Sequence, residues 1–267
     1  MNQSKILVLA ASSDIGAYLT ERYLLGGAEV VGTYRVRTPR VAELENAGAK
    51  LFPLDINSGE QVKSFSECLE ASGFLWDTLV SAPGLLDPIG PFFSTDFDDW
   101  ESSVVTNSTA QLRVLHAIHG RRNRVALSKV IFFAGGGTNG SFDNYSAYCL
   151  GKLSLIKMTE LLDSECPDLQ VSIIGTGWVN TKIHQQTLAA GGAAGSNFQK
   201  TRQFMDSGNG VGVSLETVAE CLDWCLSSPR SAVGGRNFSL VHDQWRDPQF
   251  IAELIANPDS YKLRRAS

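Results

Sequence analysis

Several features that define whole classes of proteins are scarce in this sequence. Only five of its 267 residues are cysteine, and no C-x-x-C pair occurs. We therefore expect the protein to reside in a reducing cytoplasm and not to be held together by disulfide bonds. The formal net charge is -5, which argues against a broad basic surface for nucleic acid. No apolar run reaches transmembrane length and no signal-peptide core follows the N-terminus, so we expect no membrane association.

Clusters of metal ligands are also lacking. Cys221 and Cys225 share a helical face, but no histidine cluster completes a site, so core packing is their expected role. His184 and His242 are too isolated in the sequence to be interpreted as metal ligands. The sequence therefore predicts no metal centre.

What the sequence does contain is an alternation of short β-branched segments and longer amphipathic segments. With 43% hydrophobic residues, this pattern predicts an α/β fold, in which a doubly wound parallel sheet lies between two layers of helices. Pro53 within the third expected strand places that strand at the sheet edge, as in the strand order 3-2-1-4-5-6. We expect strands near residues 5–10, 29–34, 49–54, 77–81, 129–133, 169–175 and 236–240, and helices near residues 15–25, 97–119, 146–165 and 215–227, with a short helix opening at residues 38–39.

One domain spanning residues 1–267 is expected, because neither a linker nor a repeat divides the chain. Residues 178–212 are rich in Gly, Ala, Asn, Gln and Ser and show little strand pattern, so we predict an irregular substrate lid there. Residues 241–267 form a C-terminal tail.

The first expected strand runs into a tight turn, Ala10-Ala-Ser-Ser-Asp-Ile-Gly16, which leads to a helix N-terminus. Free backbone N–H groups and the positive end of the helix dipole at such a turn can hold a pyrophosphate. Taken alone, the segment also fits an ordinary turn between a strand and a helix, because Gly16 is all that remains of the usual glycine pattern.

Tyr148 and Lys152 are four residues apart in an expected helix, so their side chains project from one face. A fixed ammonium there can lower the pKa of the phenol from its usual value of about 10 and allow proton transfer near neutral pH. The spacing alone also occurs by chance in many helices.

Taken together and in order, these segments resemble the short-chain dehydrogenase/reductase family in its compact form. Residues 9–16 stand where the family has T-G-x-x-x-G-x-G, and residues 81–84 stand where it has N-N-A-G. Residues 176–181 match P-G-x-x-x-T with threonine for proline. Asp55 matches the family's adenine-contacting acid, and Asn107 matches its active-site asparagine.

The resemblance implies a Rossmann-type fold and hydride transfer between nicotinamide C4 and a carbonyl or secondary alcohol. It implies that Tyr148 is the acid/base, that Lys152 lowers its pKa and bonds the nicotinamide ribose, and that Asn107 holds a water. As a polar residue in a long helix, Asn107 also fits a solvent-facing or back-bonded role. The implied cofactor contacts are Ala10, Ser12, Ser13, Asp14, Ile15, Gly16, Tyr34, Arg35, Asp55, Ile56, Ser81, Ala82, Pro83, Tyr148, Lys152, Gly177, Val179 and Thr181.

A homodimer or homotetramer is also implied by the resemblance, with the helices that begin near Phe97 and Ser146 pairing across two-fold axes.

The choice between NADP(H) and NAD(H) as the cofactor can be argued on physical grounds. Strand two ends at Tyr34-Arg35, with Arg37 and Arg40 close behind. Arginine binds phosphate by bidentate hydrogen bonds, which favours NADP(H) over NAD(H). Alternatively, these arginines are solvated surface charges.

The family's catalytic serine is missing. Its position, thirteen residues before Tyr148, is occupied by Gly135 in Ala134-Gly-Gly-Gly-Thr-Asn-Gly140. Thr138 is the favoured replacement, because the glycines allow the loop to bring its hydroxyl to the site. Ser141 and Asn139 are further candidates, and it is also open whether any residue replaces the serine.

Aromatic and hydrogen-bonding groups in the lid and tail favour a small, polar, sugar-like substrate, although aromatic residues there also fit packing anchors. The leading interpretation is an NADP(H)-dependent oxidoreductase acting on a carbonyl or alcohol. The alternatives are a non-catalytic NADP(H)-binding sensor or scaffold, in which the glycine and serine motifs have drifted, and an epimerase or dehydratase that uses the nucleotide transiently.

Overall fold

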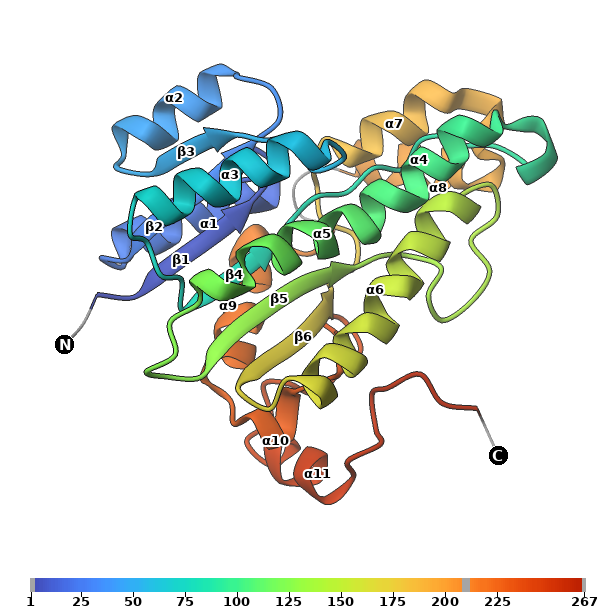
Figure 1. The fold of residues 1–267 in the computed structure, drawn as a ribbon. Helices are drawn as coiled ribbons and strands as arrows, with labels where there is room; N and C mark the ends of the chain where they lie inside the picture. Colours follow the sequence, from blue (N-terminus) through green and yellow to red (C-terminus); the bar gives the residue numbers. More distant parts are fainter. Residues whose placement is uncertain (1–2, 208–211, 266–267) are drawn as a thin grey trace.

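Seven parallel strands form one sheet in the computed structural model, which describes residues 3–207 and 212–265. The strand order is β3-β2-β1-β4-β5-β6-β7, which contains the predicted order and adds a seventh strand beside β6 (Figure 1). Pro53 pairs with Tyr34 on the edge strand β3, as expected for a residue without a backbone N–H. The strands are β1 (Lys5–Leu9), β2 (Glu29–Tyr34), β3 (Lys50–Pro53), β4 (Thr78–Ser81), β5 (Ser128–Ala134), β6 (Leu169–Gly175) and β7 (Asn237–Ser239).

Helices cover both faces of the sheet, which confirms the predicted fold class. Alternate strand residues point to opposite faces. Leu79 and Phe132 therefore pack with residues of α3, α5 and α6, whereas their neighbours Val80 and Ile131 pack with α1, α9, α10 and α11. The helices are α1 (Asp14–Leu25), α2 (Pro39–Asn46), α3 (Gly59–Ala71), α4 (Phe97–Asn107), α5 (Thr109–Ile118), α6 (Ser146–Glu165), α7 (Ile183–Ala190), α8 (Ser196–Asp206), α9 (Leu215–Ser227), α10 (Arg230–Val233) and α11 (Phe250–Ala256), with 3-10 turns η1 (Phe92–Ser94), η2 (His119–Arg121) and η3 (Gly191–Ala194).

The long helix predicted over residues 97–119 is broken into α4 and α5. Ser108 leaves the helical region, with φ -140° and ψ -91°. Two polar side chains bond the preceding turn at this point: the Ser108 hydroxyl donates to the Val104 carbonyl at 2.6 Å, and the Asn107 amide donates to the Ser103 carbonyl at 3.0 Å. Such bonds compete with the helical pattern, and here they place Asn107 at the break.

The segment predicted as an irregular lid, residues 178–212, is largely helical, so that prediction was wrong about its local structure. It contains α7, η3 and α8, while residues 208–211 lie outside the described part of the chain. The glycines that suggested an irregular loop sit between the helices: Gly191 and Gly195 have φ of 54° and 57° and separate α7 from α8.

The C-terminal tail contributes side chains to the apolar core that also contains residues of α9. Trp224 of α9 stacks on Phe250 of α11, and Trp245 is buried with them. Residues 266–267 of the predicted tail lie outside the described residues. Within residues 3–207 and 212–265, no helix is long and apolar enough to span a membrane.

Candidate active site

The carboxyl ends of the strands bring the predicted site segments to one edge of the sheet. The turn after β1, the loop after β4 and the loop after β5 all leave this edge. The chain order reverses between β1 and β4, because β2 and β3 lie on one side of β1 and the later strands on the other. Ligands of doubly wound sheets bind at this kind of reversal.

Tyr148 and Lys152 project from one buried face of α6. Their exposed fractions are 8% and 3%. The Lys152 Nζ lies 5.9 Å from the centre of the Tyr148 ring and donates to the Pro83 carbonyl at 3.2 Å in the loop after β4. The predicted pair is therefore brought together, with the ammonium held by a backbone oxygen beside the phenol ring.

Burial shifts the pKa of both groups, and the shift of the Tyr148 pKa is opposite to the predicted one. Desolvation disfavours the charged form of each group. It raises the pKa of Tyr148, with a smaller contribution from the neighbouring Cys149, and it lowers the pKa of Lys152 from 10.5 to about 8. We predicted that Lys152 would lower the tyrosine pKa. In the structure desolvation outweighs the ammonium, which is directed to Pro83.

Asn107 holds the loop that carries Pro83. Its amide donates to the Leu85 carbonyl at 2.7 Å and its side-chain oxygen accepts from the Leu85 N–H at 3.1 Å. The residue is completely buried, so the solvent-facing alternative is wrong. A water bound to Asn107, as predicted, would have to compete with Leu85 for the side-chain amide and oxygen. The structure instead shows Asn107 bonding the loop two residues after Pro83, the acceptor for Lys152.

The loop after β5 brings Gly135 directly against Tyr148. An ideal Cβ added at Gly135 would lie 2.2 Å from the Tyr148 hydroxyl oxygen. Thr138, the favoured serine replacement, donates to the Gly135 carbonyl at 3.3 Å, so its hydroxyl already has an acceptor within the loop. Ser141 lines a separate cavity of about 600 Å³ with Ser146, Cys149 and Leu150, which belong to a face of α6 other than that of Tyr148. The structure therefore argues against Ser141 as the replacement.

Helix α7 and the turn η3 cover Tyr148. The Tyr145 hydroxyl donates to Thr187 Oγ1 at 2.8 Å, and Gln186 Oε1 accepts from the Leu86 N–H at 2.9 Å. Tyr148 and Tyr145 share an apolar cluster with Leu86, Ile89 and Ala194. The predicted lid segment thus packs directly over the tyrosine, and its polar side chains Gln186 and Thr187 bond the protein itself.

The turn after β1 is as tight as predicted. Ala10 adopts φ 56°, a left-handed conformation in the place of the family's first glycine. The Ser13 hydroxyl accepts from the Gly16 N–H at 3.1 Å and caps α1. A Cβ on Gly16 would lie 2.2 Å from the Ala10 carbonyl oxygen, so a residue larger than glycine does not fit this turn.

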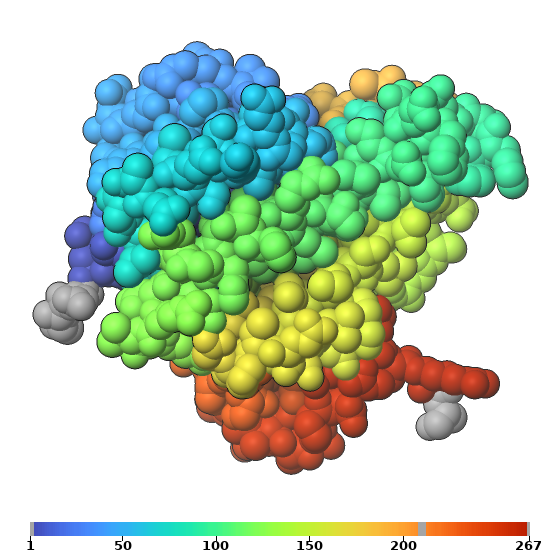
Figure 2. All heavy atoms as spheres, in the orientation of Figure 1, coloured from blue at the N-terminus to red at the C-terminus, as the bar shows by residue number. Residues whose placement is uncertain are grey.

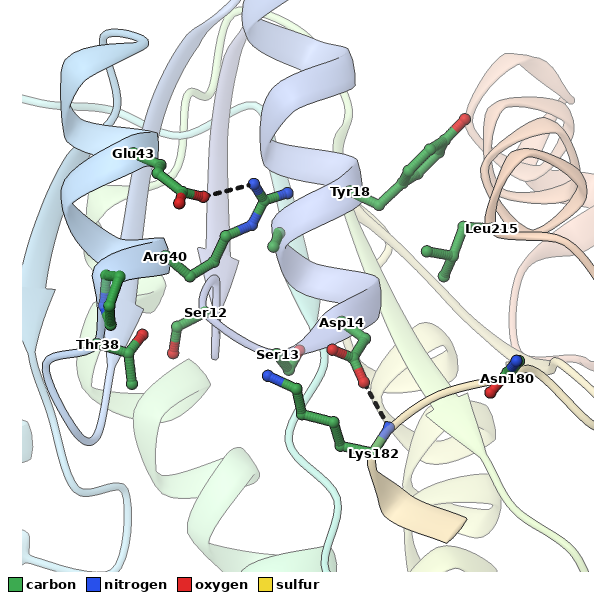
Figure 3. A pocket seen from close by; sticks show the side chains of 12 residues that line it. Ser12, Ser13, Asp14, Tyr18, Thr38, Arg40, Glu43, Asn180, Lys182 and Leu215 are labelled. Carbon is green, nitrogen blue, oxygen red and sulfur yellow. Dashed lines mark hydrogen bonds and ion pairs between the residues drawn. The ribbon is translucent and has the colours of Figure 1, made fainter. Parts of the chain in front are cut away.

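A cavity of about 480 Å³ opens beside this turn (Figure 3). Its walls come from the start of α1, the start of α2 and the segment before α7. Ser12, Ser13 and Asp14 were predicted as cofactor contacts. Arg40, predicted as one of the arginines that could bind a phosphate, also lines the cavity, and the sequence pattern did not indicate the other lining residues as cofactor contacts: Ala17, Tyr18, Thr38, Pro39, Glu43, Asn180, Lys182 and Leu215. The proline-led helix start at residues 38–39, directly after the arginine-rich strand end, was the available signal for the α2 wall.

The residues present fit a dinucleotide at this edge, with one departure. The left-handed turn, the first N–H groups of α1 and the polar cavity suit a pyrophosphate. However, Asp14 places a carboxylate in the first turn of α1, and its Oδ2 accepts from the Lys182 N–H at 2.6 Å (Figure 3). This negative charge opposes a bound phosphate and ties the segment before α7 to α1.

The three arginines after β2 differ in their partners. Arg40 bonds Glu21 at 2.7 Å and Glu43 at 2.9 Å, and Arg37 bonds Glu45 and the Tyr34 hydroxyl. Both Arg37 and Arg40 are therefore already paired with carboxylates, and only Arg40 of the two lines the cavity. Arg35 is exposed and makes no ion pair within the described residues. It is the arginine available for a phosphate.

Other predicted cofactor residues are less accessible. The buried Ser81 hydroxyl donates to Gln111 Oε1 at 2.7 Å, so its side chain points into the core, contrary to a hydroxyl contact with the cofactor. The Asp55 carboxylate accepts from the Asn57 N–H at 3.0 Å. Tyr34, Ile56 and Val179 are buried. Of the remaining residues, Ile15 lies in the first turn of α1, Ala82 follows β4, and Gly177 and Thr181 lie between β6 and α7.

The sequence is similar to those of known proteins. Residues 9–240 match the family described as enoyl-(acyl carrier protein) reductase. An NADP-dependent 3-hydroxy acid dehydrogenase of Escherichia coli O6:H1 is 28% identical over 116 residues, which cover 42% of this chain and 46% of that protein. D-threitol dehydrogenase of Mycolicibacterium smegmatis is 21% identical over 164 residues, or 60% of this chain and 63% of that protein. The chain thus spans less than two thirds of the length of these two relatives.

The fold has close counterparts among solved structures. A short-chain dehydrogenase/reductase from Saccharomyces cerevisiae superposes with a TM-score of 0.78 at 18% identity, covering 92% of this chain and 98% of that chain. The family match includes the turn after β1, Asn107, Gly135, Tyr148 and Lys152. The chain belongs to the short-chain dehydrogenase/reductase family.

Proposed function

We propose that the protein is an NADP(H)-dependent oxidoreductase that interconverts a carbonyl and a secondary alcohol, with Tyr148 as the acid/base. The observation that carries this proposal is the Tyr148–Lys152 pair, buried beside the Pro83 carbonyl at the carboxyl edge of the sheet. A protein that only bound the nucleotide would not need the Tyr148 hydroxyl at this position, where burial opposes the charged form of the phenol.

The chain's own groups account for the proton. In reduction, a bound nicotinamide supplies the hydride to the carbonyl carbon. The Tyr148 hydroxyl donates its proton to the carbonyl oxygen as that oxygen gains charge. Lys152, still mainly protonated at neutral pH with a pKa of about 8, favours the resulting phenolate. Asn107 keeps the loop of Pro83 in place, and α7 excludes water from the tyrosine.

We propose a small hydroxylated carbonyl compound as the substrate and residues 178–207 as part of the lid over it. The cover over Tyr148 combines apolar side chains with Gln186 and Thr187. A polar substrate could exchange its hydroxyl groups for the bonds those two side chains make to the protein. The two relatives, named for a 3-hydroxy acid and for D-threitol, support substrates of this class.

Arg35 is our candidate for the residue that selects NADP(H), because it is the exposed arginine after β2 without an ion pair in the described part of the chain. Replacing Arg35 by Glu should raise the Kd for NADPH by about tenfold or more, and should affect the Kd for NADH much less. Calorimetric titration of both nucleotides checks this. Tighter binding of NADH than NADPH by the wild-type protein would contradict the assignment.

We propose that two or four copies associate through α4, α5 and α6. Figure 2 shows these helices as one continuous face, coloured green to yellow, and α4 packs against α6. Phe97 of α4 and Leu150 of α6 are 57% and 46% exposed. Large apolar side chains on adjacent helices are typical of an interface between copies. The five free cysteines agree with a cytoplasmic location.

A non-catalytic sensor is the second candidate, because Asp14 opposes phosphate at α1 and residue 135 has no hydroxyl. An epimerase that regenerates its nucleotide is a third candidate. NADPH oxidation should be followed over a panel of 3-oxo acids, keto-sugars and simple ketones, with Tyr148→Phe and the remote Tyr261→Phe as matched variants.

The oxidoreductase proposal expects turnover that falls by about 10²-fold or more in Tyr148→Phe and is unchanged in Tyr261→Phe. NADPH binding without oxidation, identical in all three proteins, would favour the sensor. Substrate conversion without net NADPH oxidation would favour the epimerase.

A further inference from the structure

We propose that Gly135 is a positioning residue: the absence of a side chain there lets the Tyr148 hydroxyl occupy the place that the missing serine would need. The serine and this placement of the tyrosine are mutually exclusive, so the site uses the phenol as its sole side-chain hydroxyl toward the substrate oxygen. The catalytic part of this inference rests on the proposed function, whereas the steric part does not.

The steric conflict is severe. An ideal Cβ at Gly135 would lie 2.2, 2.4 and 2.5 Å from the Tyr148 hydroxyl oxygen, Cζ and Cε1. Real Cβ atoms essentially never approach another heavy atom closer than 3.0 Å. The atoms in conflict are the end of a rigid ring, so even alanine at this position would have to push the ring away from the end of β5.

The surroundings leave the ring little room to yield. Its Cα belongs to the buried face of α6, and the ring packs with Tyr145, Leu86 and Ile89 beneath the cover formed by α7 and η3. Displacing the ring would open this cluster and move the hydroxyl relative to Lys152. Misplacing a reacting group by about 1 Å can lower a rate by about 10²-fold.

The Tyr148 hydroxyl is also free for a substrate. It makes no hydrogen bond within residues 3–207 and 212–265, whereas Thr138, the favoured candidate for a second hydroxyl, donates to the Gly135 carbonyl. A phenol without a protein partner can direct its proton to a substrate oxygen. The geometry at Gly135 thus compensates for the lost serine by bringing the phenol into its place.

Gly136 provides a matched control. A Cβ there would approach Phe142 no closer than 3.6 Å, which is ordinary contact. Neither Gly135 nor Gly136 is among the glycines with positive φ, so an added methyl group does not strain the backbone at either position. Gly135→Ala and Gly136→Ala therefore differ mainly in whether the new carbon meets Tyr148.

The activity test compares Gly135→Ser, Gly135→Ala and Gly136→Ala with the wild-type protein. We expect both Gly135 variants to lose about 10²-fold in kcat, with an unchanged Kd for NADPH, and Gly136→Ala to keep wild-type turnover. The pH profile of kcat should shift to lower pH in the Gly135 variants, because a ring pushed from its buried position has a lower pKa. Restored or improved turnover in Gly135→Ser would overturn the proposal.

The stability test needs no substrate. Gly135→Ala should lower Tm by about 5 °C and Gly136→Ala should leave it unchanged. In a Tyr148→Ala background, which removes the ring, Gly135→Ala should no longer lower Tm. An equal loss with and without the ring would overturn the inference. If Tyr148→Ala does not fold, equal Tm values for Gly135→Ala and Gly136→Ala would overturn it as well.

The two tests separate the inference from the proposed function. If the wild-type protein reduces no carbonyl but the loss of Tm at Gly135 depends on Tyr148, the steric conflict is supported and only the proposed activity is lost. If the wild-type protein is active and Gly135→Ser is equally active, the proposed activity is supported and the positioning role is wrong.

Discussion

Replacing Lys152 by methionine should make the protein more stable and catalytically inactive. Lys152 is buried, and no carboxylate bonds its ammonium among the residues that the structure describes; its acceptor is the Pro83 carbonyl. Desolvation lowers its pKa from 10.5 to about 8. Methionine has an unbranched chain of similar volume, so it can fill the same space without a charge.

The size of the effect follows from proton binding. Between pH 8 and 10.5 the folded state binds fewer protons at Lys152 than the unfolded chain does, so stability rises with pH across that interval. Below pH 8 Lys152 is charged in both states, so the free energy of unfolding is lowered by the full cost of burying the ammonium. A tenfold change in an ionisation constant corresponds to about 1.4 kcal/mol, so this cost is about 3 kcal/mol. Losing the bond to Pro83 offsets about 1 kcal/mol of the gain.

Lys152→Met should therefore raise the free energy of unfolding by about 2 kcal/mol at pH 7, or Tm by about 6 °C. The advantage should shrink above pH 8 and, because the bond to Pro83 is still lost, become a deficit of about 1 kcal/mol above pH 10.5. Urea denaturation of both proteins across this pH range measures it. Lys63→Met, at an exposed lysine of α3, is the control and should change stability by less than about 0.5 kcal/mol. A less stable Lys152→Met with the same deficit at every pH would refute the reasoning.

Three further changes test other parts of the structure. Ala10→Gly should raise the free energy of unfolding by about 1 kcal/mol, because glycine relieves the left-handed strain at φ 56°. Thermal unfolding measures this change. The control is Ala47→Gly, at φ -75°, which should lower the free energy of unfolding instead. Asp14→Asn should tighten NADPH binding by about threefold to tenfold, because it removes a negative charge near the phosphates. The asparagine side-chain oxygen can still accept from the Lys182 N–H. Weaker binding in a fluorescence titration would count against a pyrophosphate at α1. Leu150→Glu should shift the protein toward the monomer in sedimentation velocity, because it places a charge on the exposed face of α6, and an unchanged sedimentation coefficient would remove α6 from the interface.

Part of the fold could be read from local patterns in the sequence. Pro53 indicated the edge strand, because a residue without a backbone N–H cannot donate one of the hydrogen bonds that a central strand makes to its neighbours. The spacing of Tyr148 and Lys152 was enough to place both on one face of α6, since a helix repeats every 3.6 residues. The lid was harder, because glycines that end short helices resemble glycines in an irregular loop.

The chemical state of the site was decided by tertiary structure. The amino-acid order alone specifies which groups are present and which share a helical face: a phenol, an ammonium and no hydroxyl at residue 135. It did not determine that desolvation would raise the pKa of Tyr148, or that the phenol would fill the space left by Gly135. Helical spacing is local, but desolvation and close contact depend on residues from the loops after β4 and β5, from α4 and from α7, which meet only when the chain is folded.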